Sequence, residues 1–325
     1  MTDPADGPLT VGVDIGGTKT DAVVLDGAGR ILERHRTATV GGSAGVLGTA
    51  TGVVDTLAAA TRRHPAEFGS IGVGIPGRVD PGTGMVAHAV HLGLENLALG
   101  PLLADRFGVP VRIENDVNAA AVGAFHVLGM DADRSMAYLN FGTGVAAGIV
   151  REGALWRGSG GNAGEVGHIP IDPLGPICKC GQRGCLEMSA SGSAVARLWP
   201  TAHPRPVQDL MDRAAEGDER ARRVWNGVIT GIASAVRILV LSVDVDVVVL
   251  GGGLVSAGDP VLRAVRSRLG EWGRESSFLS SLALPARVRL LDGAGPPDET
   301  SGQPVAALGA AYLGRSARPV PATSG

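Results

Sequence analysis

The segment Glu114-Asn-Asp-Val-Asn118 gathers carboxylate and carboxamide side chains where a strand gives way to a helix. The apolar run before it predicts a strand over 109–114, and the alanine-rich stretch after it predicts a helix over 116–127. Ligands collect at the carboxyl ends of strands in α/β sheets, and phosphoryl transfer needs a carboxylate that takes the acceptor's hydroxyl proton. Asp116 is therefore a candidate general base, and Asn115 a candidate group for orienting the acceptor. The alternative is that either residue only caps the helix.

A second segment, Asp14-Ile-Gly-Gly-Thr-Lys19, has the composition of a phosphate-binding turn. Gly16 and Gly17 let the backbone approach phosphate oxygens, and the leading aspartate can hold a hydrated Mg²⁺. The order of Thr18 and Lys19 differs from that of a P-loop, and the next run predicts a strand instead of a helix. An ordinary glycine-rich hairpin turn is the alternative interpretation.

Two more glycine-rich segments are similar in sequence to dinucleotide-binding motifs. Gly72-Val-Gly-Ile-Pro-Gly77 spells G-x-G-x-x-G, but a proline and a turn stand where the helix of a Rossmann fold begins, which excludes a dehydrogenase. The loop ending at Gly77 either lines a sugar pocket or forms a plain turn. Leu250-Gly-Gly-Gly-Leu254 lies between a predicted strand and a predicted helix, and its glycines can let an adenine or ribose lie against bare backbone.

All three cysteines of the chain lie close together, with a histidine ten residues before the first of them. His168, Cys178, Cys180 and Cys185 form the Cys₃His set of a closed, structural Zn²⁺ site, which would stabilise the proline- and glycine-rich loop between them. Three cysteines cannot form a paired disulfide framework, so free core cysteines or a redox pair are the alternatives.

The same loop carries groups suited to a sugar. Metal ligation by one ring nitrogen leaves the other nitrogen of His168 free to donate to a hydroxyl. Glu165 lies just before this histidine and Glu187 just after the last cysteine, so both carboxylates can accept from further hydroxyls. For each glutamate alone, a solvated surface charge is the alternative.

These candidate residues depend on strands and helices that bring them together. Strands alternate with helices in two sets, each opening with paired strands and a Gly-Thr turn, which is typical of two α/β domains with a cleft between them. The tail after Gly314 is expected to be disordered. Strands are predicted at 11–15, 20–25, 30–37, 70–74, 85–90, 109–114, 136–141, 145–151, 246–250 and 287–291, and helices at 44–63, 99–107, 116–127, 218–239, 260–269 and 304–313.

The bulk composition argues against several classes of protein. With 29 basic and 32 acidic side chains in 325 residues the net charge is −3, whereas nucleic-acid binding needs a concentrated positive field. Apolar residues make up 44% of the chain, but the most apolar run, 238–250, is too short and too charged to span a bilayer. Residues 1–10 lack the apolar core of an export signal, so a cytoplasmic location is expected.

Together, these motifs resemble the bacterial ROK sugar kinases of the actin-like ATPase superfamily. The resemblance runs from near residue 10 to near residue 315 and keeps the family's order of motifs. The matching stretches are Asp14-Ile-Gly-Gly-Thr-Lys19, Gly74-Ile-Pro-Gly77, Glu114-Asn-Asp-Val-Asn118, Phe141-Gly-Thr-Gly144, Gly164-Glu-Val-Gly-His168, Cys178-Lys-Cys-Gly-Gln-Arg-Gly-Cys-Leu-Glu187 and Leu250-Gly-Gly-Gly253. Any one of them is a weak signal, but the ordered set is specific.

The resemblance implies two actin-like, ribonuclease-H-like α/β domains around a cleft that closes on the sugar. A small N-terminal domain would span 1–118 and be completed by a C-terminal helix at about 301–315. A large domain with the zinc loop would span 119–300, and 316–325 would be a disordered tail. Family members are commonly homodimers or homotetramers, so the same is expected here, with neither nucleic acid nor membrane as a partner.

The resemblance also implies a role for each motif. Asp116 would act as general base on the 6-hydroxyl of a hexose, Mg²⁺ would bridge the ATP phosphates, and the cysteines with His168 would hold a structural zinc. Further sugar contacts would come from Gly77, Asn115, Glu165, His168 and Glu187. ATP contacts would come from Asp14, Gly16, Gly17, Thr18, Lys19, Gly142, Thr143, Gly144, Gly251, Gly252 and Gly253.

Two departures from the family pattern bear on the substrate. Where many glucokinases of the family have Asn-Leu-Gly-Trp, this chain has His91-Leu-Gly-Leu94, and Ala146 and Ala147 replace common glycines. Glucose, with a role in glycolysis, is the first choice. N-acetylglucosamine, N-acetylmannosamine, fructose and mannose are the competing sugars, and polyphosphate is the competing donor.

Two other functions are weighed against the kinase. A sugar-responsive repressor of the same family would carry a helix-turn-helix domain ahead of the first strand, and the start of that strand near residue 10 is expected to leave no room for it. A sugar-binding module without catalysis is the second alternative. The presence of Asp116 and of the phosphate loops argues against it.

Overall fold

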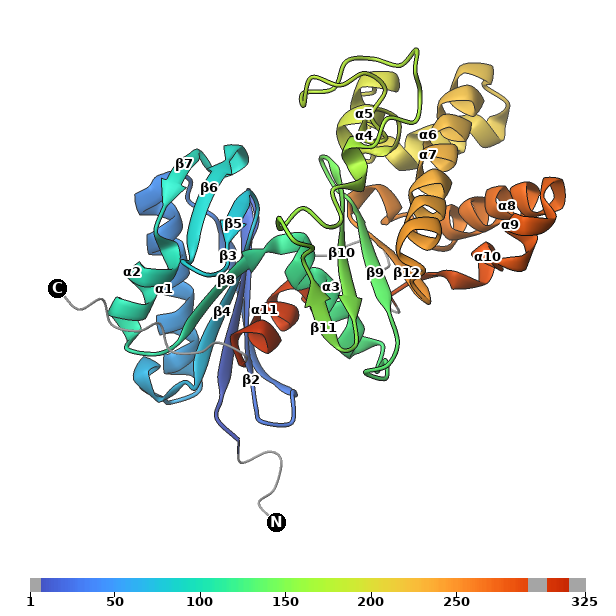
Figure 1. Ribbon diagram of the computed structural model, residues 1–325. Helices are drawn as coiled ribbons and strands as arrows, with labels where there is room; N and C mark the ends of the chain where they lie inside the picture. Colours follow the sequence, from blue (N-terminus) through green and yellow to red (C-terminus); the bar gives the residue numbers. More distant parts are fainter. Residues whose placement is uncertain (1–6, 292–302, 316–325) are drawn as a thin grey trace. The chain divides into compact units, whose positions relative to one another are not determined.

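The computed structural model describes residues 7–291 and 303–315. The chain divides into two compact units: unit 1 is Met1–Met130 with Pro304–Gly325, and unit 2 is Asp131–Gln303 (Figure 1). Each unit contains a five-stranded sheet covered by helices. The predicted class of two α/β domains is therefore confirmed.

Unit 1 is built on a mixed sheet. Its strands are β1 (Thr10–Ile15), β2 (Lys19–Leu25), β3 (Ile31–Ala38), β4 (Ser70–Ile75) and β8 (Val111–Asn115). In the order β3-β2-β1-β4-β8, the first three strands pair antiparallel and the last three parallel. Every residue of β4 is buried, and in β1 only Asp14 keeps partial exposure, because helices cover both faces.

The two faces of this sheet are covered differently. The helices of unit 1 are α1 (Gly42–Ala60), α2 (Leu99–Phe107), α3 (Asp116–Val127) and α11 (Val305–Arg315). α1 and α2 pack on one face, and α3 and α11 on the other (Figure 1). A Cβ at Gly12 would lie 2.0 Å from a carbonyl oxygen of α11, and one at Gly72 would lie 1.7 Å from another. Only glycine lets α11 lie this close to the strands, so the C-terminal helix is an integral part of unit 1.

A small antiparallel sheet belongs to the same unit and lies between β4 and α2 in the chain. Its strands are β5 (Arg78–Asp80), β6 (Met85–Ala89) and β7 (Leu94–Leu97), and the 3₁₀ turn η3 (Val90–Leu92) connects the last two. A further 3₁₀ turn, η2 (Pro65–Glu67), precedes β4. The sequence predicted only the middle strand of this sheet, because its neighbours are short and half polar.

Unit 2 repeats the arrangement of a hairpin beside parallel strands. Its strands are β9 (Met136–Phe141), β10 (Val145–Arg151), β11 (Ala154–Trp156), β12 (Val247–Gly251) and β13 (Val288–Leu290). They follow the order β11-β10-β9-β12-β13, in which β12 runs parallel to both of its neighbours. The carboxyl ends of β9 and β12 therefore meet at one edge of the sheet.

Helices and 3₁₀ turns complete unit 2. They are η4 (Val166–His168), α4 (Glu187–Ala190), α5 (Gly192–Leu198), α6 (Pro206–Glu216), α7 (Glu219–Val243), η5 (Gly253–Val255), α8 (Asp259–Glu275), α9 (Ser277–Ser281) and α10 (Leu284–Arg287). α7 begins where the carboxylate of Asp218 accepts the backbone N–H of Ala221 at 2.8 Å. Its buried stripe, including Val228, Ile232 and Leu239, forms much of the core of unit 2.

Two helices, α1 and α7, are long and apolar enough to cross a membrane by length and composition alone. Both contribute several buried residues to the core of their own unit, which accounts for their apolar character without a bilayer.

The predicted strands and helices occur in the predicted order, although several of their boundaries differ and the sequence missed some short elements and α6. α8 continues to Glu275, six residues past the predicted end. The predicted domain boundary after residue 118 falls inside α3, whereas the structure keeps this helix in unit 1 and divides the chain after Met130. The reason is that α3 packs along α11, where a Cβ at Gly309 would lie 1.7 Å from a carbonyl oxygen of α3. The predicted tail, 316–325, lies outside the described residues.

Candidate active site and metal centre

Asp14 and Asp116 approach each other beside Gly74 in unit 1. A Cβ added to Gly74 would lie 3.7 Å from Oδ1 of Asp14 and 3.6 Å from Cα of Asp116. Gly74 is also the residue opposite Asp14 in the register of β1 and β4. The missing side chain lets the start of α3 approach the strand that carries Asp14, so two carboxylates that are far apart in sequence share one site.

Asp14 and Asp116 are each partly exposed as residues, but protein surrounds their carboxyl groups closely. Burial raises the pKa of Asp14 to about 8, and the charges of Asp116 and Asp21 add to the rise. Burial also raises the pKa of Asp116, while the hydrogen bond from the backbone N–H of Val117 opposes this rise. Two carboxylates that resist simultaneous ionisation suit proton transfer at one of them and cation binding at the other.

Asn115 caps α3, which is the alternative that the sequence left open. Its Oδ1 accepts the backbone N–H groups of Val117 at 3.0 Å and Asn118 at 3.3 Å. Its Nδ2 donates to the carbonyl oxygen of Gly77 at 3.3 Å. The cap fixes the first turn of α3, and with it Asp116, and ties the loop ending at Gly77 to the same place. Contact between Asn115 and a substrate stays a prediction.

The segment after β1 is a hairpin turn, in which the N–H of Gly16 donates to the carbonyl oxygen of Lys19 at 2.9 Å. A strand follows it, which confirms that it is not a P-loop. His91 lies beside this turn, because a Cβ at Gly17 would be 3.5 Å from Cβ of His91. The position at which the chain departs from the glucokinase pattern thus borders the candidate phosphate turn.

In unit 2, the turn Gly142–Gly144 and the loop Gly251–Gly253 meet at the carboxyl ends of β9 and β12. A Cβ at Gly252, whose φ is +89°, would lie 2.5 Å from the backbone of Phe141, so only glycine permits this approach. The carbonyl oxygen of the first glycine of the turn accepts the N–H of Gly192 at 2.8 Å, which anchors the start of α5. This edge of the sheet offers bare backbone of the kind that a phosphate chain contacts.

His168, Cys178, Cys180 and Cys185 converge on one point. Their ligand atoms all lie within 4.8 Å of one another. Sγ of Cys180 is 3.6 Å from Sγ of Cys185, and Sγ of Cys178 is 3.7 Å from Nδ1 of His168. Tetrahedral bonds of about 2.3 Å to sulfur and about 2.1 Å to nitrogen separate ligand atoms by roughly 3.5–3.8 Å, so this donor set fits Zn²⁺.

The three thiols of this cluster differ in their pKa values. Burial raises the pKa of Cys178 to about 12 and also raises that of Cys185. The backbone N–H of Gln182 lowers the pKa of Cys180 to about 6. Because burial disfavours the thiolates of Cys178 and Cys185, these two thiols would lose their protons on binding a metal ion whose charge compensates theirs.

Glu187 borders both the metal ligands and the phosphate turn of unit 2. Its Oε1 accepts from the thiol of Cys178 at 3.0 Å and lies 3.8 Å from Nδ1 of His168. Its Oε2 would lie 3.0 Å from a Cβ added to Gly144. Glu165 immediately precedes η4, and its backbone carbonyl accepts the N–H of His168 at 3.2 Å, but its side chain is exposed. The predicted sugar-binding residues of unit 2 therefore lie in one loop region.

The predicted site residues fall into two groups, one in each unit. Sequence reasoning missed Asp21, which lies directly opposite Asp14 on β2. Its two carboxylate oxygens pair with Arg34 at 3.1 Å and with Arg36 at 2.7 Å. The available signal was the hairpin register, since a hairpin centred on residues 17 and 18 must place 21 across from 14.

The sequence and the fold are similar to those of known proteins. The sequence matches the model of the ROK family over residues 10–287. A glucokinase of Halalkalibacterium halodurans is 31% identical over 323 residues, covering 93% of this chain and 94% of the relative. An N-acetylmannosamine kinase of Yersinia pseudotuberculosis is 34% identical over 244 residues, covering 74% and 82%. The structure of a ROK family glucokinase from Streptomyces griseus in complex with glucose and AMPPNP matches with a TM-score of 0.72 and 28% identity over 94% of this chain and 99% of that chain.

Proposed function

Because the chain belongs to the ROK family, we propose that it is a sugar kinase that transfers the terminal phosphoryl group of ATP to the 6-hydroxyl of a hexose, with glucose as the first substrate. The observation that carries the proposal is the pair of crowded carboxylates, Asp14 and Asp116, at the carboxyl ends of β1 and β8. A glucokinase and an N-acetylmannosamine kinase are both among the relatives, so an N-acetylated hexose is the second candidate.

Asp116 is the proposed general base. The hexose oxygen forms a bond to the γ-phosphorus, the bond from that phosphorus to the ADP oxygen breaks, and the hydroxyl proton passes to the Asp116 carboxylate. Burial raises the pKa of this carboxyl group, which makes its carboxylate a better proton acceptor. Asn115 holds the residue in place through the cap on α3.

Glycine-rich turns of both units are the proposed contacts of the nucleotide phosphates. Gly16, Gly17, Thr18 and Lys19 form the hairpin turn of unit 1, and Gly142–Gly144 forms that of unit 2. Asp14 supplies an oxygen ligand of the type that Mg²⁺ prefers, and its partial exposure leaves room for a hydrated ion. When bound with ATP, Mg²⁺ would neutralise charge that develops on the phosphates.

The metal cluster and its neighbours are the proposed sugar-binding side of unit 2. With Nδ1 of His168 facing the cysteines, its Nε2 is the nitrogen left for a sugar hydroxyl. Glu165 and Glu187 would accept from other hydroxyls. Zn²⁺ in this Cys₃His set has a structural role, because no coordination position stays open. We also propose a cytoplasmic location and a homodimeric or homotetrameric state.

A coupled assay of ADP release across a panel of hexoses tests the proposal. The panel contains glucose, mannose, fructose, N-acetylglucosamine and N-acetylmannosamine, each with ATP and Mg²⁺. Tripolyphosphate releases no ADP, so it is tested as the alternative donor by measuring the sugar phosphate that forms. We expect glucose to give the highest kcat/KM and glucose 6-phosphate as the product. Sugar binding by calorimetry without sugar-dependent ADP release would contradict the kinase and favour a binding module. A clear preference for an N-acetylated sugar would overturn only the choice of glucose.

A further inference from the structure

Solvent reaches the three thiols of the metal cluster unequally. Cys178 and Cys185 are buried, at 3% and 1% exposure, whereas Cys180 is exposed. A Cβ added to Gly181 would meet no atom within 4 Å beyond its chain neighbours, so the space beside Cys180 is open. A small oxidant in solution therefore reaches Cys180 before it reaches the other two thiols.

Cys180 is exposed because it lies at the tip of a tight turn. The N–H of Cys178 donates to the carbonyl oxygen of Gln182 at 2.8 Å, and the N–H of Gly181 donates to the carbonyl oxygen of Cys178 at 2.9 Å. The turn needs a φ of +90° at Gly181, which glycine adopts without strain. These bonds place Cys180 at the outer edge of the cluster.

A second thiol lies within reach of Cys180. Its Sγ is 3.6 Å from Sγ of Cys185, a residue that forms an antiparallel bridge with Pro170. Cys178 is engaged elsewhere, because its thiol donates to Oε1 of Glu187 at 3.0 Å. A disulfide has an S–S bond of about 2.05 Å, so a short movement of the turn would join Cys180 to Cys185.

We infer that Cys180 is a site of oxidative modification, at which hydrogen peroxide converts the metal cluster into a disulfide with Cys185. Both residues react as thiolates, the form in which cysteine ligates a metal ion. The Cys180 thiolate attacks one peroxide oxygen, the O–O bond breaks, and a sulfenic acid and a hydroxide ion form. The Cys185 thiolate then attacks the sulfenic sulfur, the S–S bond forms, and a second hydroxide ion leaves. The two sulfurs together lose the two electrons that reduce the peroxide.

The disulfide would remove two of the four ligand atoms of the cluster, so the remaining pair would no longer hold a metal ion. Cys178 would then lose the metal that fixes it beside Glu187 and His168, the two side chains proposed to bind the sugar. This consequence rests on the proposed function. Oxidation should therefore lower the affinity for hexose together with the zinc content.

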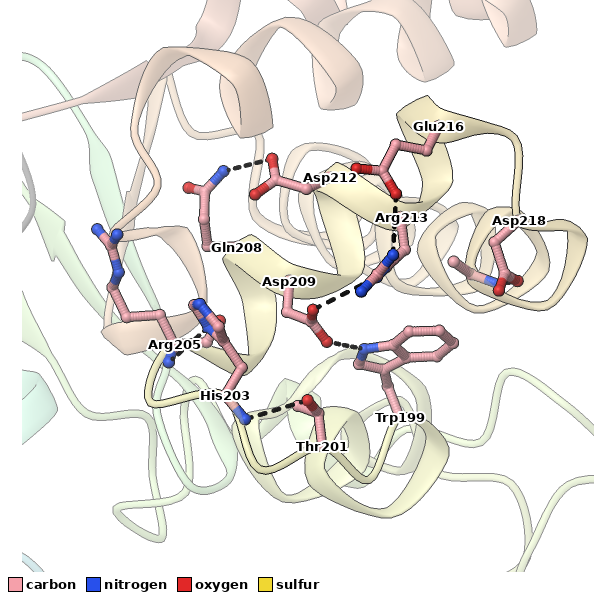
Figure 2. A network of polar contacts seen from close by, with 11 residues as sticks. Trp199, Thr201, His203, Arg205, Gln208, Asp209, Asp212, Arg213, Glu216 and Asp218 are labelled. Atoms are coloured by element: carbon pink, nitrogen blue, oxygen red, sulfur yellow. Dashed lines mark hydrogen bonds and ion pairs between the residues drawn. The ribbon is translucent and has the colours of Figure 1, made fainter.

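The change should stay within the loop, because the helices that follow have contacts of their own. A Cβ at Gly231 of α7 would lie 2.6 Å from Cβ of Ala190, so α4 packs directly on α7. Figure 2 shows the network between the end of α5 and α6, in which the indole of Trp199 donates to Asp209 at 2.7 Å and Arg213 lies 3.8 Å from the same carboxylate. These contacts do not involve the cysteines, so a dithiol reductant should restore the loop.

Tryptic mapping of the zinc-loaded protein after peroxide treatment tests which thiols react. Cleavage after Lys179 and Arg183 puts the three cysteines on three different peptides, 158–179, 180–183 and 184–197. We expect 180–183 to be linked to 184–197, with one zinc released for each disulfide formed. A link to 158–179, an overoxidised 180–183 without a link, or unreacted cysteines at peroxide concentrations that oxidise free cysteine would overturn the assignment.

Cys180→His is the matched variant, because an imidazole supplies a metal ligand and no sulfur. It should keep its zinc at a peroxide dose that strips the wild type, whereas Lys179→Ala should lose zinc as the wild type does. Equal loss of zinc from Cys180→His would overturn the role of Cys180. If Cys180→His does not bind zinc, the peptide map of the wild type still decides.

Calorimetry with glucose before and after oxidation measures the consequence for binding. Kd should rise about 10-fold or more and recover with dithiothreitol. A disulfide that leaves glucose binding unchanged would overturn the effect on the sugar site. The disulfide and the released zinc need no turnover, so they test the modification even if the protein does not phosphorylate glucose.

Discussion

Replacement of Asp116 by asparagine isolates the proton-accepting role of this residue. Asparagine keeps the shape of the side chain and an Oδ1 that can accept the N–H of Val117, which is 2.9 Å from Oδ1 of Asp116. The cap of α3 is supplied by Asn115, so the helix start does not depend on the substituted residue. Asp116→Asn therefore removes a base and a charge, and it leaves the fold intact.

The expected loss is in kcat. A positioned general base contributes about 10²- to 10⁴-fold, so kcat of Asp116→Asn should fall by about that factor. KM for ATP should change little. Removing the neighbouring charge lowers the pKa of Asp14, because Asp116 is one of the groups that raise it, and Asp14 then binds a cation at least as well. The melting temperature should stay within a few degrees of wild type.

Asp21→Asn is the control for an indirect effect through Asp14. Asp21 also raises the pKa of Asp14, but its own carboxylate is held by Arg34 and Arg36. Both variants remove one charge beside Asp14, and only one removes the proposed base. Loss of the two partly exposed ion pairs should cost Asp21→Asn no more than about 5-fold in kcat.

Steady-state kinetics with glucose and ATP, and thermal melting of each variant, measure these effects. The assignment of Asp116 as general base would be refuted by a kcat within about 10-fold of wild type in correctly folded Asp116→Asn. An equal loss in Asp21→Asn would also refute it, because the effect would then be transmitted through the charge on Asp14.

Three further predictions concern stability and metal content. The folded-state pKa of Asp14 is raised from 3.8 to about 8, so its contribution to stability is fully present below about pH 4 and is lost as the pH rises through about 8. In metal-free protein, the melting temperature of Asp14→Asn should therefore equal that of wild type near pH 4. It should exceed the wild-type value by a growing margin as the pH rises toward 9, and a difference that does not change with pH would contradict the raised pKa. Elemental analysis should find about one zinc per chain, and Cys180→Ser should lose both the zinc and sugar binding, while Lys179→Ala keeps both; active protein without zinc would exclude the site. Gly72→Ala should lower the free energy of unfolding, measured by urea titration, by about 1–3 kcal/mol or more, because its Cβ would lie 1.7 Å from a carbonyl oxygen. Gly48→Ala is the control: its Cβ would meet open space on α1, so the change should be neutral or stabilising.

Local features of the chain were predictable from sequence because they depend on neighbouring residues. A glycine-rich hairpin turn was the alternative interpretation of the segment around Gly16 and Gly17, and β1 and β2 form a hairpin there. The asparagine at the end of β8 suggested a helix cap, and Asn115 provides it. The cysteines and His168 predicted a metal site from ligand type and spacing, and their ligand atoms converge in the structure.

Contacts between distant residues could not be derived in this way. No local pattern shows that Gly74 lies between Asp14 and Asp116, because this depends on the order of strands in the sheet and on how closely α3 packs. The raised pKa values follow from that packing, since desolvation is a property of the assembled site. The boundary after Met130 likewise depends on the packing of α3 against α11, two helices that lie far apart in the sequence. Residue types and spacing thus determined which chemistry the protein carries, and tertiary packing decided which side chains meet and in what charge state.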